Sequence, residues 1–151
     1  MTEPTESLIT DEHRAAIGQR GEPVKVVVRE ADARRMRDLL NDTDPRYADG
    51  TGIAPPYVLS GLAGGRPGGA VPQILPNGIL TQTEWQFLKP FKIGQELQAY
   101  GKVFDIRDRL GGRYGYSILV MTGTEYVDEA GDIVASTITT ITQFDPAGLK
   151  S

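Results

Sequence analysis

Cysteine is absent from the 151-residue chain, and histidine occurs once, at His13. Without cysteine there is no disulfide, no thiolate nucleophile and no cysteine metal site. One histidine also excludes a metal site with two histidine ligands within a single chain. The sequence therefore predicts no metal centre, and we expect no cofactor.

Long apolar runs and an excess of positive charge are also lacking. No run approaches the roughly 20 residues that a membrane-spanning helix needs. Residues 1–7 are polar and acidic, unlike a secretory signal or a transit peptide. A net charge of -4 and a pI near 5.0 argue against nucleic acid, whose phosphates attract a basic surface. We expect no membrane span, no nucleic-acid partner and a cytoplasmic location.

The composition that remains is that of one globular domain. Hydrophobic residues make up 39% of the chain and charged residues 24%, while 18 glycines and 10 prolines indicate many loops. A chain of this length holds one hydrophobic core. We predict a single domain over residues 1–151, in which residues 1–9 contain too little apolar surface to pack and are mobile.

Hydrophobic periodicity predicts helices in the first part of the chain and long strands in the second half. A short helix is expected after the cap residue Thr10, and an amphipathic helix over residues 30–40. Strands rich in β-branched residues are predicted at 24–29, 79–87, 95–105, 116–127 and 133–144. The links between the last four suit antiparallel neighbours.

The stretch from Asn41 to Leu62 connects the helical part to the strands. Asp42, Asp44 and Pro45 predict a tight turn. Pro56 then begins a short apolar run, which predicts a buried helix as far as Leu62. A single apolar helix followed by long strands requires the sheet to wrap around it, since it has no other partner. The Gly- and Pro-rich segment 61–76 is either a flap over a ligand tunnel or a plain surface connection.

Several segments, in this order, resemble the MaoC-like hydratases of the hot-dog fold. The residues Asp42-Thr43-Asp44-Pro45-Arg46-Tyr47 align with the family's loop Asp-x-Asn-Pro-x-His. Ile53-Ala54-Pro55-Pro56 looks like the start of the family's central helix. Residues 87–97 are similar to a strand-starting pattern R-P-x-x-x-G-D-x-L, with Gln95 in place of Asp, and residues 127–135 match the last hairpin. The resemblance implies an α+β fold in which an antiparallel sheet wraps around a central helix.

The family's activity is implied in the same way. Its members add water to a trans-2-enoyl thioester of CoA or acyl carrier protein, or remove water from the 3-hydroxyacyl product. An Asp and a His together activate the water, and the His transfers a proton near neutral pH. Asp42 occupies the position of that Asp, whereas Tyr47 occupies the position of the His. Tyrosine, with an ordinary pKa near 10, is a poor general base.

The resemblance therefore implies a degenerate half of a hydratase, which shapes the acyl-binding tunnel but performs no catalysis. Its partner is expected to be a His-bearing MaoC-like subunit, or a second copy of the chain in a homodimer. Pro55 and Pro56 also lack the N–H that would polarise the thioester carbonyl. Asp42 and Tyr47 are the candidate, degenerate catalytic positions. The candidate substrate-binding residues are Ala54, Pro55, Pro56, Tyr57, Gly64, Gly65 and Asn77.

Two other functions remain open. The chain is an active homodimeric hydratase or thioesterase if Asp42 and Tyr47 act with Glu84, a carboxylate in a predicted strand. It is a non-enzymatic acyl-binding module if its pocket is apolar and has no ionisable group at the mouth. Asp42 also has a purely structural interpretation, since Asp often caps such turns. His13, in a predicted surface helix, is assigned a structural or solvent role.

Overall fold

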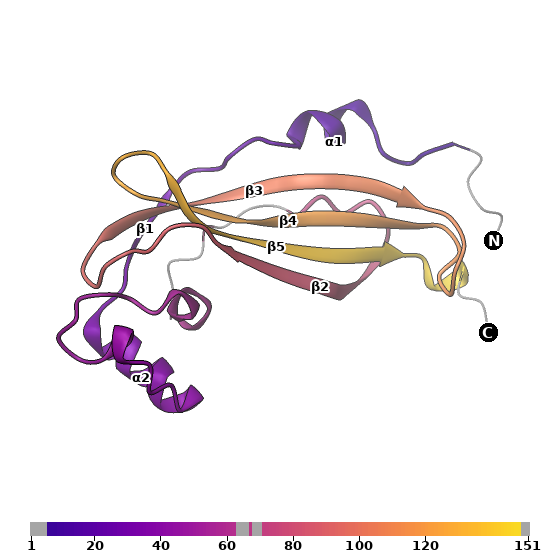
Figure 1. Cartoon of the computed structure of the whole chain (residues 1–151). Helices are drawn as coiled ribbons and strands as arrows, with labels where there is room; N and C mark the ends of the chain where they lie inside the picture. The colour runs from indigo at the N-terminus through magenta and orange to yellow at the C-terminus, as the bar shows by residue number, and fades with distance from the viewer. Residues whose placement is uncertain (1–5, 63–66, 68–70, 149–151) are drawn as a thin grey trace.

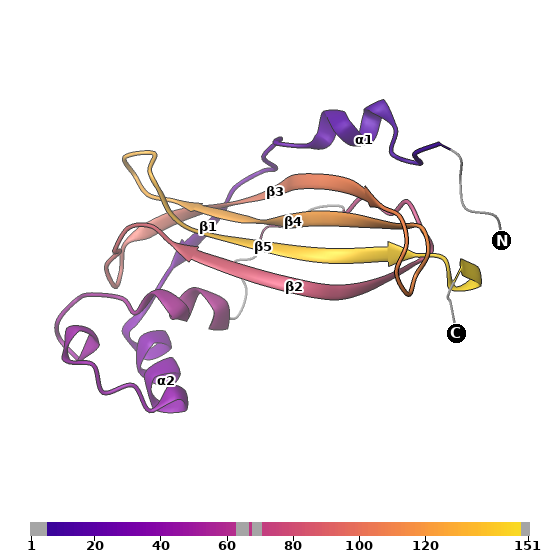
Figure 2. The same ribbon diagram turned by 45° about the vertical axis from the view of Figure 1, so that its right-hand side comes forward.

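A five-stranded antiparallel sheet forms the centre of the computed structural model, which describes residues 6–62, 67 and 71–148. The strand order is β1-β3-β4-β5-β2, and the sheet is bowed along its length (Figures 1 and 2). The strands are β1 (Val24–Val27), β2 (Asn77–Phe87), β3 (Glu96–Arg109), β4 (Ser117–Val127) and β5 (Ile133–Phe144). The predicted antiparallel sheet is confirmed. β3 runs four residues past its predicted end at 105, because Arg109 still pairs with Ser117.

Two α-helices precede the long strands, as predicted. The first, α1 (Asp11–Ala16), begins after Thr10, whose side chain accepts the backbone N–H of His13 at 3.2 Å. The His13 ring returns the contact, since its Nδ1 accepts the N–H of Thr10 at 3.0 Å. His13 therefore caps a helix. The second helix, α2 (Glu30–Leu40), has the predicted bounds and ends at Asn41 in the left-handed conformation.

The expected central helix is shorter and tighter than predicted. The chain forms a 3₁₀ helix, η2 (Pro56–Gly61), whose side chains Val58 and Leu59 are buried. Pro55 and Pro56 cannot donate backbone hydrogen bonds, and the N–H of Val58 donates to the carbonyl of Pro55, three residues earlier, at 3.1 Å, which is the spacing of a 3₁₀ helix. Gly61 lies against Met36 of α2, so η2 packs on that helix as well as on the sheet.

Two hydrophobic clusters lie on one face of the sheet, which we call the inner face. The first cluster joins η2 to one end of the sheet, and its members include Val58, Leu59, Phe91, Leu97 and Tyr126. The second cluster covers the other end, and its members are Ile9, Leu75, Ile106, Ile118 and Val120. The hydrophobic core thus consists of two parts, one at each end of the long strands.

The beginning of the described chain is held on the sheet. Ser7 Oγ donates to Asp108 Oδ2 at 2.6 Å, and the N–H of Leu8 donates to the Tyr116 hydroxyl at 3.1 Å. Ile9 is buried in the second cluster. Residues 7–9 therefore make contacts with the sheet that their low apolar content did not predict, while residues 1–5 lie outside the described residues and the expected mobility stays a prediction. Within the described ranges, no helix is long and apolar enough to cross a membrane.

Candidate functional site

The loop after α2 is folded by its own acidic side chains. The N–H of Asp42 donates to the carbonyl of Arg37 at 2.9 Å, which closes the end of α2 after the left-handed Asn41. Asp44 then caps a second 3₁₀ helix, η1 (Pro45–Tyr47), by accepting the N–H of Arg46 at 3.0 Å. These turns place Asp42 beside η2. There it contacts Tyr57, which lies fifteen residues further along the chain.

Asp42 has both carboxylate oxygens in hydrogen bonds. Oδ1 accepts the N–H of Asp44 at 2.9 Å, and Oδ2 accepts the hydroxyl of Tyr57 at 2.7 Å. The Tyr57 hydroxyl, followed by the Asp44 N–H, holds the pKa of Asp42 below its ordinary value. Burial, together with the bond to Asp42, raises the pKa of Tyr57 well above its ordinary value. The pair is therefore a fixed anion and a fixed neutral donor.

Tyr47 has a different environment from Tyr57. Its ring lies under the guanidinium of Arg46, 5.2 Å from the ring centroid, and Arg46 in turn binds Asp44 at 2.7 Å. Within the described residues its hydroxyl forms no hydrogen bond. Tyr47 thus has no general base beside its hydroxyl that would activate it.

Arg37 fixes the loop to α2. Its guanidinium donates to the carbonyl of Tyr47 at 2.5 Å and to Asp49 Oδ1 at 2.5 Å, and its side chain is only 11% exposed. The Arg37 hydrogen bond lowers the pKa of Asp49. The amphipathic pattern of residues 30–40 gave no indication of this role for Arg37. Its position near the helix end, just before the acidic loop, is the signal that could have indicated it.

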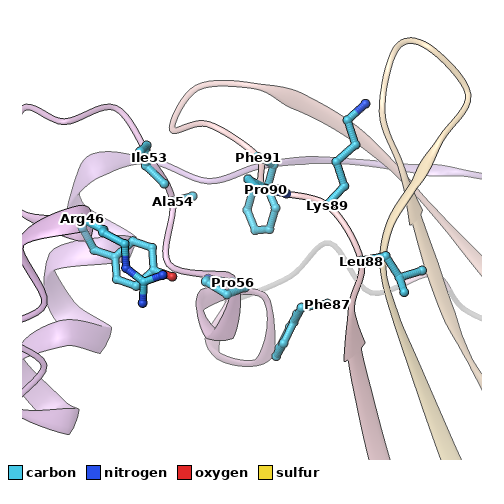
Figure 3. Close-up of a pocket in the computed structure, with 10 residues that line it drawn as sticks. Arg46, Ile53, Ala54, Pro56, Phe87, Leu88, Lys89, Pro90 and Phe91 are labelled. Atoms are coloured by element: carbon cyan, nitrogen blue, oxygen red, sulfur yellow. The ribbon is translucent and has the colours of Figure 1, made fainter.

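A cavity of about 300 Å³ lies between this loop and the segment that follows β2 (Figure 3). Its mainly apolar lining includes Tyr47, Ala54, Pro56, Phe87, Leu88 and Phe91. Arg46 and Lys89 are the charged residues in the described lining, and the Lys89 ammonium binds Asp128 at 2.7 Å and Asp132 at 3.0 Å. The two walls are joined by the N–H of Ala54, which donates to the carbonyl of Phe91 at 3.0 Å.

The structure groups only some of the predicted site residues. Tyr47, Ala54 and Pro56 line the cavity, while Asp42 and Tyr57 form their hydrogen-bonded pair outside its lining. Pro55 is buried at the start of η2. Gly64 and Gly65 lie outside the described residues.

Three other polar candidates lie away from the cavity. Asn77 begins β2 and Phe87 ends it, so the strand separates Asn77 from the cavity by about 33 Å at 3.3 Å per residue. Glu84 is exposed on β2 and accepts from Gln86 at 3.4 Å. His13 lies on α1, beside β3, whereas the loop after α2 lies beyond the other side of the sheet (Figure 1).

Phe87, Leu88 and Phe91 are lining residues that sequence analysis did not assign to the site. Aromatic side chains dominate cores and interfaces, so residue type alone does not assign Phe87 and Phe91 to a site. Their signal was the strand-starting pattern over residues 87–97. Among the described residues, no group of His, Asp or Glu side chains is arranged to hold a metal ion.

Residues 15–137 match the family model described as the FAS1-like, dehydratase domain region. The chain belongs to this FAS1-like dehydratase family. The matched residues contain the loop 41–53, η2 and most of the sheet, so the FAS1-like dehydratase domain includes the whole cavity. The predicted membership of the MaoC-like group is thereby confirmed, whereas its assignment as the degenerate half is left as a prediction.

Solved structures share the hot-dog fold of this FAS1-like dehydratase domain. The ChsH1-ChsH2 complex from Mycobacterium tuberculosis has a TM-score of 0.65 at 17% identity, over 85% of this chain and 90% of that chain. The HadBC 3R-hydroxyacyl-ACP dehydratase complex from the same organism has a TM-score of 0.58 at 15% identity, over 89% and 98%. R-hydratase PhaJ1 from Pseudomonas aeruginosa has a TM-score of 0.55 at 19% identity, over 85% and 82%. No curated protein sequence matches the chain.

Proposed function

We propose that this chain is the non-catalytic, tunnel-forming subunit of a heteromeric enoyl-thioester hydratase or 3-hydroxyacyl dehydratase. Its substrate is an acyl group carried on CoA or acyl carrier protein. The observation that supports this most directly is the state of the two positions where the family has Asp and His. Asp42 has both oxygens in hydrogen bonds, and no base among the described residues bonds the Tyr47 hydroxyl.

Hydration requires one group that takes a proton from water and returns it to the acyl chain near neutral pH. Asp42 is a weak base, because its pKa is lowered and Tyr57 occupies one of its oxygens. Tyr57 does not release its proton, because its pKa is raised. The described lining of the cavity contains no imidazole and no carboxylate. The reaction adds or removes only water, so the proposal needs no redox cofactor.

The free edge of β2 supports a partner subunit. β2 is 11 residues long, and every residue except Trp85 is exposed, including Ile79, Leu80 and Phe87. A long exposed edge of this kind pairs readily with another strand. Two of the similar structures are described as complexes, ChsH1-ChsH2 and HadBC. We propose a His-bearing MaoC-like chain as the partner across this edge.

Co-expression with such a partner tests the proposal. The purified complex should hydrate trans-2-enoyl-CoA, measured by loss of enoyl absorbance, and replacing the partner's histidine by alanine should abolish turnover. Tyr47→Phe in this chain should leave kcat within about twofold, because the Tyr47 hydroxyl has no role in proton transfer. A large loss of kcat in Tyr47→Phe, with the complex intact by gel filtration, would contradict the proposal.

A second candidate is an active homodimer that uses Asp42. It is favoured by the retention of Asp42, which lies outside the cavity lining and is held by Tyr57 of η2. The isolated chain would then turn over enoyl-CoA, and Asp42→Asn would reduce that turnover at least tenfold. The same neighbourhood weighs against a purely passive acyl-binding module, since Tyr47 lines the cavity with Arg46.

A further inference from the structure

Five threonines form a polar patch on the inner face of the sheet. They are Thr83, Thr122, Thr124, Thr137 and Thr139, and we call them the threonine patch. Thr139 pairs with Thr122 on one side and Thr83 on the other. Thr137 pairs with Thr124 and with Trp85. Side chains of directly paired residues lie on the same face, so the five form two adjacent rows across β2, β5 and β4.

Aromatic stacking identifies that face as the inner one. The Trp85 ring stacks with Tyr126, a member of the first cluster, at 6.1 Å between ring centroids. Side chains alternate along a strand, so Thr122 and Thr124 lie on the same face as Tyr126 and as Val120 of the second cluster. The threonine patch therefore fills the gap between the two hydrophobic clusters, where a core-facing surface is normally apolar.

The hydroxyls of the threonine patch are unused. Across the described residues, none of the five donates to or accepts from another group. In contrast, Thr81 and Thr142 bind each other at 2.9 Å. Four of the five are half-buried and Thr83 is exposed. Valine would have the same shape and strand preference without leaving a hydroxyl to be satisfied, so the strand fold alone does not require threonine here.

The patch continues the surface of the cavity. Phe87 lines the cavity and its ring stacks with Trp85 at 5.8 Å. Trp85 and Thr83 follow on the same face of β2, so the two rows lie about 7 and about 13 Å from Phe87 along the strand. An acyl chain that leaves the cavity along the inner face therefore contacts the stacked rings of Phe87 and Trp85 first, and then the hydroxyls of the threonine patch.

We propose that the threonine patch binds oxygen substituents on the body of the acyl group, remote from the thioester. This inference rests on the function proposed above and specifies its substrate class as a hydroxylated or keto acyl thioester. Threonine hydroxyls both donate and accept, so they satisfy either substituent. A plain hydrocarbon chain would cover these hydroxyls without replacing their bonds to water, which is unfavourable.

Binding of two acyl-CoA probes tests the proposal without requiring turnover. Decanoyl-CoA and its ω-hydroxy derivative are titrated by calorimetry into the isolated chain and into the complex with the co-expressed partner. We expect the hydroxylated probe to bind about tenfold tighter to at least one of these forms, since one or two added hydrogen bonds give a factor of that order. Because no reaction is needed, an active isolated chain would refute the proposed function but leave this comparison intact.

The test variant is the triple substitution Thr122→Val, Thr137→Val and Thr139→Val. It should remove the preference while the chain stays folded, and it should bind decanoyl-CoA at least as tightly as the original protein. Thr140→Val is the matched control, because Thr140 directly follows the patch residue Thr139 on β5 and points to the opposite face. The control should retain the preference.

Three results would overturn the proposal. The original protein shows no preference between the probes, or binds neither in either form. The triple variant retains the preference of the original protein. The triple variant loses the partner subunit in gel filtration, which would make the patch a subunit interface rather than a ligand surface.

Discussion

Replacing Tyr57 by phenylalanine removes one hydroxyl and leaves the ring in place. That hydroxyl donates to Asp42 Oδ2 at 2.7 Å and is the main reason that the pKa of Asp42 is lowered. A hydrogen bond to a charged group contributes about 1.5–3 kcal/mol net. Tyr57 is half-buried, so we expect Tyr57→Phe to destabilise the fold by about 1.5 kcal/mol, near the lower limit.

Thermal unfolding measures this loss. In a domain of this size a loss of 1 kcal/mol lowers Tm by about 2–4 °C, so Tyr57→Phe should lower Tm by about 3–6 °C at pH 7. Tyr47→Phe is the matched control, because the Tyr47 hydroxyl forms no hydrogen bond within the described residues. Its Tm should stay within about 1 °C of the original protein.

The difference in Tm between the original protein and Tyr57→Phe should also depend on pH. A carboxyl whose pKa is lowered on folding stabilises the protein above its ordinary pKa, which is 3.8 for Asp42. That stabilisation is lost as the pH falls through the lowered value. In Tyr57→Phe the pKa of Asp42 returns toward its ordinary value, so the variant loses less on acidification. The gap in Tm should be widest above about pH 5 and should narrow below the ordinary pKa. Equal Tm values for the two tyrosine variants at pH 7, or a gap that does not change with pH, would refute the reasoning.

Two further variants test how the site and sheet are held. Arg37→Lys should lower Tm by several degrees, because lysine cannot reach both the Tyr47 carbonyl and Asp49. Arg34→Lys is the control, since Arg34 is an exposed partner of the same Asp49 at 3.5 Å. It should shift Tm by about 1 °C or less. Equal shifts would show that Arg37 does not hold the loop. Gly123→Ala should prevent stable folding, because its Cβ would overlap the backbone carbonyl of the paired strand, and Gly21→Ala should be tolerated, since its Cβ meets its nearest atom at 3.8 Å. A folded Gly123→Ala with unchanged circular dichroism would contradict the pairing of β4 and β5.

The parts of the fold with strong periodicity could be predicted from the sequence. α2 and β5 have the expected bounds, because their apolar residues repeat at helical and strand spacing and turn residues flank them. The helix after Pro55 could not be predicted in the same way. Pro56 suits the first turn of an α-helix and of a 3₁₀ helix equally, so residue type alone does not distinguish the two.

The candidate site was only partly predictable, because its contacts join segments far apart in the chain. The turn made by Asp42 is local and follows from residue type. The bond from Tyr57 to Asp42 depends on how η2 returns to the loop, and the cavity depends on pairing of Ala54 with Phe91, 37 positions later. A local sequence pattern cannot predict a contact between residues so far apart in the chain.

The enoyl-CoA hydratase rate of the purified chain alone, from pH 6 to pH 9, tests the central claim most directly. Position 47 holds a tyrosine in place of the family's histidine, and Asp42 is held by Tyr57. The rate should therefore not exceed that of the same buffer without protein. Addition of a His-bearing MaoC-like partner should produce turnover. A rate from the isolated chain that rises with protein concentration and is lost in Asp42→Asn would contradict the account.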